Sequence, residues 1–90
     1  MTNIYIYCLF DGTNNARSFR GVYSSIKAAH RDALKAANRG QTEVVMYCDG
    51  QTDIPTVSNL RNIFKGKCDI HVDYRTNRSV VTIYKTRLKE

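Results

Sequence analysis

An alanine-rich amphipathic segment over residues 26–39 constrains the fold of this chain more than any other feature. Its apolar side chains recur at the spacing of one stripe along a helix: Ile26, Ala29, Ala33, Leu34 and Ala37. Ser24 or Ser25 can cap the start, and Gly40 is the residue expected to end it. Because a helix with one apolar stripe has to bury it against another layer, the chain is expected to fold as layers.

Short apolar runs around this segment predict strands. They cover residues 3–10, 17–23, 42–48, 68–74 and 80–87, and a short helix is predicted over 56–64. The first run is apolar on both faces, which favours a central strand, while the cluster 49–53 is typical of a turn. The predicted order is β-β-α-β-α-β-β, an α+β sandwich with a mostly antiparallel sheet and both helices on one face. With 90 residues, a single domain over 1–90 is expected.

The charge balance narrows the classes of partner. Fourteen Lys and Arg against eight Asp and Glu give a net charge of +6, which favours acidic surfaces or nucleic acid. No apolar run reaches the roughly 18 residues of a membrane span, and the start of the chain lacks the features of a signal peptide. Cys8, Cys48 and Cys68 are far apart and odd in number, which favours free thiols in the cytoplasm. We expect no membrane partner, no cofactor and no metal.

A column of positive charge is the clearest candidate site. Lys27, Arg31 and Lys35 are four residues apart and therefore lie on one side of the helix, where like charges repel each other. An acidic partner would turn that repulsion into attraction, whereas the alternative is a solvated helix face. Further candidates are Arg17, Arg20 and Arg39 beside the column, and Arg61 and Lys65 on the second helix.

Two groups of acidic residues raise the question of catalysis. Asp11 and Asp49 each close an apolar run, and clustered carboxylates at strand ends can hold two metal ions. The stretch 28–51 resembles a helix and strand of ribonuclease H proteins, which implies a metal-dependent nuclease. The chain departs from that family because its helix offers only Asp32, and because 90 residues are too few for the three-stranded meander with which that family opens. Asp69, His71 and Asp73 are expected to share one face of a strand, where they could bind a metal ion. We interpret this face as a solvated one, because no neighbouring strand offers a further acidic ligand.

The order of elements in residues 3–40 carries a second resemblance. A strand rich in Tyr and Ile, a polar turn over 11–15, and a strand ending Gly-Val-Tyr-Ser-Ser lead directly into the alanine-rich helix. This layout resembles small bacteriophage accessory proteins that inhibit host RNA polymerase, and several anti-CRISPR proteins. The resemblance implies a non-enzymatic viral protein that occupies a surface of a host protein or nucleoprotein complex.

Three functions therefore stay open. The first is an inhibitor or interaction protein that binds through the basic helix face, as a monomer or as a dimer through the edge of the last strand. The second is a nucleic-acid-binding domain that contacts the phosphates of DNA or RNA with the same residues, for which affinity would fall steeply with salt. The third is a ribonuclease H-like nuclease.

Overall fold

The computed structural model describes residues 4–12, 16–38, 43–77 and 79–88. In chain order its elements are β1 (Tyr5–Asp11), the 3-10 helix η1 (Ala16–Ser18), β2 (Phe19–Tyr23), α1 (Ile26–Ala37), β3 (Val45–Cys48), β4 (Gln51–Asp53), α2 (Val57–Phe64), β5 (Ile70–Arg75) and β6 (Val80–Arg87). None of the helices in these ranges is long and apolar enough to cross a membrane.

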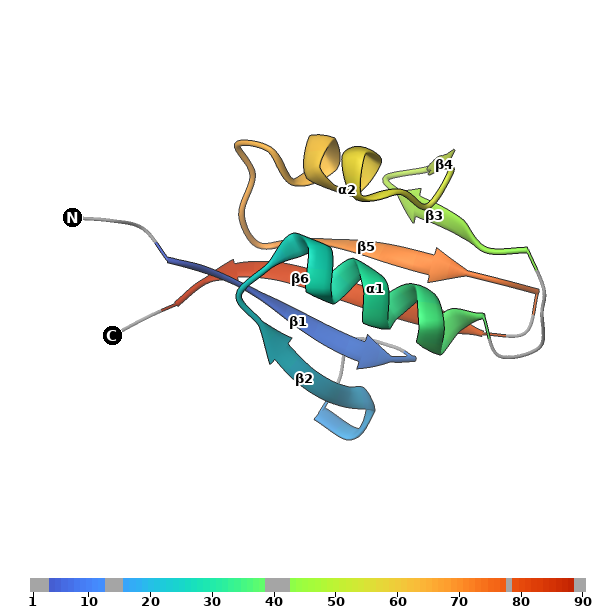
Figure 1. Ribbon diagram of the computed structural model, residues 1–90, viewed down its shortest axis with the longest axis horizontal. Coiled ribbons are helices and arrows are strands. Elements are labelled where there is room, and N and C mark those ends of the chain that lie inside the picture. Colours follow the sequence, from blue (N-terminus) through green and yellow to red (C-terminus); the bar gives the residue numbers. More distant parts are fainter. Residues whose placement is uncertain (1–3, 13–15, 39–42, 78, 89–90) are drawn as a thin grey trace.

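The strands form one antiparallel sheet in the order β2-β1-β6-β5-β3-β4. Figure 1 shows α1 lying over β1 and β6, with α2 beside it toward the β3–β4 end. The ring of Phe64 at the end of α2 stacks on Tyr7 of β1 at 5.8 Å, so both helices cover the same face. The predicted α+β class, with an antiparallel sheet and helices on one face, is confirmed.

The start and the buried stripe of α1 follow from the sequence. Ser25 is the cap, because its hydroxyl accepts a hydrogen bond from the backbone N–H of Ala28 at 3.3 Å. Three alanines of the predicted stripe are fully buried: Ala29, Ala33 and Ala37. Since a methyl group is the smallest apolar side chain, these positions let the helix backbone lie close to the sheet.

The covered face of the sheet supplies the rest of the core. Its most deeply buried side chains are Leu9, Met46, Val72, Tyr74, Val81 and Ile83. Along β5, Val72 and Tyr74 are fully buried and His71 is exposed, as expected for a strand with one wet face, but Asp73 on the same face as His71 is buried as well. Each such burial stabilises the fold by about 1.5–3 kcal/mol.

The cluster predicted as a turn over 49–53 contains a strand as well. Asp49 and Gly50 both adopt positive φ, 50° and 81°, as the two central residues of a tight hairpin turn do. The chain then pairs back on β3 through Asp53 opposite Met46, which forms β4. The prediction missed this strand because its side chains are polar and exposed, so no apolar pattern marks it.

The strand predicted over 17–23 is shorter than expected. Its first residues form the 3-10 helix η1, and β2 begins at Phe19. The pairing with β1 shifts register so that Arg20 has no partner residue across the ladder. A bulge and a charge both discourage further strand pairing at an open edge. Since β6 lies between β1 and β5, the predicted dimer through the edge of the last strand is wrong.

The buried side chain of Lys85 links the last strand, β6, to the end of α2. Its side chain is buried, and its ammonium group donates a hydrogen bond to the backbone carbonyl of Phe64 at 2.7 Å. The same ammonium lies 4.4 Å from the centre of the Tyr5 ring. The lysine therefore satisfies a carbonyl at the C-terminal end of α2 and ties that helix to β6.

Candidate functional site

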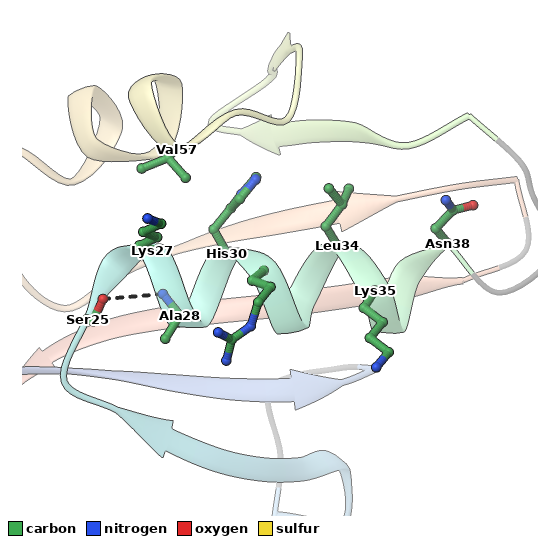
Figure 2. A pocket seen from close by; sticks show the side chains of 9 residues that line it. Ser25, Lys27, Ala28, His30, Leu34, Lys35, Asn38 and Val57 are labelled. Carbon is green, nitrogen blue, oxygen red and sulfur yellow. Dashed lines mark hydrogen bonds between the residues drawn. The ribbon is translucent and has the colours of Figure 1, made fainter.

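A groove of about 780 Å³ runs along the outer side of α1, beside the start of α2. We call it the α1 groove. It is lined by Ser25, Lys27, Ala28, His30, Arg31, Leu34, Lys35, Asn38 and Val57. Figure 2 shows His30 and Leu34 pointing to the side of the helix that faces Val57, and Lys35 pointing to the opposite side.

The α1 groove combines an apolar floor with a cationic rim. Ala28, Leu34 and Val57 supply hydrocarbon surface that is only partly buried by the protein itself. The three cations predicted from the helical spacing, Lys27, Arg31 and Lys35, are all exposed along it. A ligand that fits this surface has to offer apolar groups and negative charge together.

The rim cations differ in how far the chain compensates them. Lys27 and Lys35 have no carboxylate within ion-pair distance among the described residues, which matches the expected uncompensated charge. Arg31 departs from that expectation, because its Nε lies 3.0 Å from the Asp32 carboxylate. This pair is exposed, so it contributes little to stability and leaves the Arg31 fork accessible.

Asp32 is itself held in place from the neighbouring strand. The Tyr23 hydroxyl donates a hydrogen bond to its carboxylate at 2.7 Å. That bond and the hydrogen bond from Arg31 lower the pKa of Asp32 below its ordinary value. The carboxylate therefore stays ionised and anchors Arg31 beside the groove.

His30 forms part of the groove lining and reaches into the core. Its ring is almost fully buried, and Nδ1 shares a hydrogen bond with the Tyr74 hydroxyl at 2.6 Å. Burial disfavours the charged imidazolium, so the pKa of His30 lies below its ordinary value. The side chain is therefore a neutral packed histidine.

This buried imidazole predicts a specific pH dependence of stability. The unfolded chain binds a proton at His30 near pH 6.5, whereas the folded chain does so only at lower pH. The free energy of unfolding should therefore fall as pH drops below about 6.5, by at most about 1.4 kcal/mol per pH unit. Urea unfolding at several pH values measures it. His30→Asn should be less sensitive to acid than the parent, and an equal loss in both proteins would contradict this assignment.

Among the residues that the structure describes, the other basic candidates do not line the α1 groove. Arg20 is paired with Asp11 at 3.3 Å on the β2 edge, and Arg17 precedes that strand in η1. Arg61 lies exposed on α2 and Lys65 follows its last turn. Arg39 falls outside the described residues. The candidate site is therefore narrower than predicted and centres on Lys27, Arg31 and Lys35.

The two aspartates considered for metal catalysis are far apart. Because β1 and β3 run in opposite directions in the sheet, Asp11 at the end of β1 and Asp49 after β3 lie at opposite ends. Three strand spacings, roughly 14 Å, separate the two strands as well. Within the described ranges, no three His, Cys, Asp or Glu side chains are grouped as metal ligands.

The polar face of β5 is held together by internal hydrogen bonds. Asp73 is buried, accepts a hydrogen bond from Thr82 at 2.9 Å and pairs with Arg75 at 3.1 Å. Asp69 accepts hydrogen bonds from the hydroxyls of Tyr84 and Thr86. The face predicted to be solvated is thus a cross-strand network in which these carboxylates have structural partners.

Two features of the surface were missed by the sequence analysis. The first is Val57, which completes the floor of the α1 groove from a separate helix. The second is the sheet face without helices, where Phe19 and Val22 are 45% and 54% exposed. The apolar residues on both faces of β1 are a signal for the second feature, but a central strand shows the same pattern.

No protein-family model, curated protein or solved structure matches this chain.

Proposed function

We propose that this chain is a non-enzymatic interaction protein that binds an acidic, amphipathic segment of a protein partner in the α1 groove. The observation that carries the proposal is the apolar floor of Ala28, Leu34 and Val57 beside exposed cations. Apolar side chains of the partner would be buried on the floor, and its carboxylates would pair with the rim. In such contacts the buried anchors supply most of the affinity, while charge speeds encounter and sets orientation.

The proposed mode of action is occlusion of a partner surface. A chain of 90 residues can still cover a binding site on a much larger assembly. The partner class that we propose is a host protein complex, in keeping with the resemblance to small phage inhibitors. The chain would act by denying that surface to the complex's own ligands.

A nucleic acid is the second candidate ligand, because phosphates would also attract the three rim cations. The composition of the groove favours a protein over it. A phosphate backbone has no apolar groups with which to cover Leu34 and Val57, and none of the nine lining residues is a Phe, Tyr or Trp on which a base could stack.

Three fluorescent probes test the proposal by anisotropy. The first is a helical peptide with leucines on one face and glutamates on the other, the second has the same composition scrambled to abolish the apolar face, and the third is a single-stranded oligonucleotide. We expect the amphipathic peptide to bind at least about tenfold more tightly than the scrambled peptide, since only the former can bury leucines on the floor. Equal binding of the two peptides would contradict the proposal. Tighter binding of the oligonucleotide, with a steep salt dependence, would favour the nucleic-acid function instead.

A further inference from the structure

The β3–β4 hairpin and the residues that flank it gather negative charge on an otherwise basic chain. Residues 43–60 contain Glu43, Asp49 and Asp53 and no Lys or Arg. All three carboxylates are exposed, and within the described residues none has a cation at ion-pair distance. Lys67 lines a small hollow with Asp49 and Asp53 but forms no ion pair with either. Uncompensated carboxylates and uncompensated ammonium groups thus occur on different surfaces of one molecule.

Ile54 gives this acidic surface an apolar anchor. At 72% exposure it is the most exposed of the large apolar side chains in the described ranges. With Glu43 and Asp53 it lines a hollow of about 380 Å³ at the edge of the sheet. The side-chain amide of Asn59 donates a hydrogen bond to the Ile54 backbone carbonyl at 2.8 Å, which holds this segment in place.

The spacing of these groups matches that of the α1 groove. Asp53 lies opposite Met46 of β3, and Glu43 precedes Met46 by three residues in the segment that leads into β3, so at the rise of an extended chain the two residues are roughly 10 Å apart. Ile54 follows Asp53 toward the Glu43 end. Lys27 and Lys35 are eight residues apart on a helix, or roughly 12 Å, with the apolar floor beside them.

We propose that the α1 groove of one copy receives the β3–β4 hairpin of a second copy. Ile54 would cover the apolar floor, while Glu43 and Asp53 would lie beside the rim cations. The inference rests on the proposed function, because it uses the same groove and the same ligand chemistry. Since hairpin and groove are different surfaces, the contact is head-to-tail and can extend to further copies.

The association should be weak and open to competition. One hairpin in one groove covers far less than the roughly 800 Å² per partner of a stable complex. An acidic partner bound in the α1 groove would exclude the hairpin, so partner binding and self-association would compete for the same groove.

Charge reversal of each surface tests this arrangement by sedimentation equilibrium from micromolar to millimolar concentration. One variant carries Glu43→Lys and Asp53→Lys in the hairpin, and the other carries Lys27→Glu and Lys35→Glu in the groove. The parent should exceed the monomer mass as its concentration rises, and high salt should suppress this. Each variant alone should need at least about tenfold higher concentration to associate. An equimolar mixture should associate again, because each surface then meets a complement. A parent that stays monomeric, or a mixture that fails to associate, would overturn the inference.

The amphipathic peptide probe separates this inference from the function on which it rests. The hairpin variant keeps an intact α1 groove and should bind the peptide at least as tightly as the parent does. Peptide binding without self-association would overturn the inference and leave the proposed function standing. If the parent neither binds the peptide nor self-associates, the proposed function and this inference are both overturned.

Ile54→Ser, which changes no charge, should also weaken self-association, and an unchanged association would show that the apolar anchor plays no part.

Discussion

Replacing Phe64 by alanine is expected to lower the free energy of unfolding by about 3–5 kcal/mol. The ring is fully buried at the end of α2, where it stacks on Tyr7 of β1, with the Lys85 ammonium 6.0 Å from its centre. Its removal would leave a cavity between helix and sheet and weaken the contact that docks α2 on β1. Urea unfolding followed by circular dichroism measures the change.

Phe19 provides the matched control for this substitution. It is 45% exposed on β2 and packs edge-on against Phe10 at 5.6 Å, so Phe19→Ala should cost about 0.5–1.5 kcal/mol. Because a small domain could unfold completely with Phe64→Ala, the milder Phe64→Leu provides a measurable intermediate. Equal losses for the alanine variants of Phe64 and Phe19 would show that α2 is not docked on the sheet as described.

Reversing the rim of the α1 groove should have the largest effect on binding. The triple variant Lys27→Glu, Arg31→Glu and Lys35→Glu replaces attraction for the partner's carboxylates with repulsion. We expect affinity for the amphipathic acidic peptide to fall on the order of 100-fold, or about 2.7 kcal/mol. Fluorescence anisotropy gives the affinity, and circular dichroism checks that the helix persists.

The chain offers a control with the same change of net charge. Arg61→Glu, Lys65→Glu and Lys67→Glu reverse three exposed cations outside the groove lining, so both triple variants bring the net charge from +6 to zero. This control should change peptide affinity by less than about threefold once long-range attraction is screened by salt. A similar loss in both variants would mean that net charge, not the groove, determines binding.

The sequence predicted those elements whose own residues determine them. The α1 stripe was predictable because alanine and leucine recur at helical spacing, and its cap because Ser25 directly precedes the first turn. The apolar side chains on one face of β5 were predictable as well, because apolar and polar residues alternate in its own sequence. The strand β4 was not, because its polar residues become a strand only by pairing with β3. The bulge at Arg20 likewise depends on the register between two strands.

The sequence predicted the cationic rim of the candidate site but not its apolar floor. The spacing of Lys27, Arg31 and Lys35 was sufficient to place three cations on one side of a helix. The apolar floor required knowing that Val57, on another helix, lines the same groove as Leu34 of α1, and no local pattern contains that information. Without the floor, the sequence could not distinguish a phosphate-binding surface from one that binds an amphipathic protein segment.

The most direct measurement is an amide chemical-shift titration of ¹⁵N-labelled protein with the unlabelled amphipathic peptide. If acidic amphipathic ligands are bound along the outer side of α1, the largest changes will fall on Ala28, Leu34 and Val57, with smaller changes at the adjoining cations. Largest changes instead at Phe10, Phe19 and Val22 would locate binding on the sheet face that carries no helix, and would contradict the proposal.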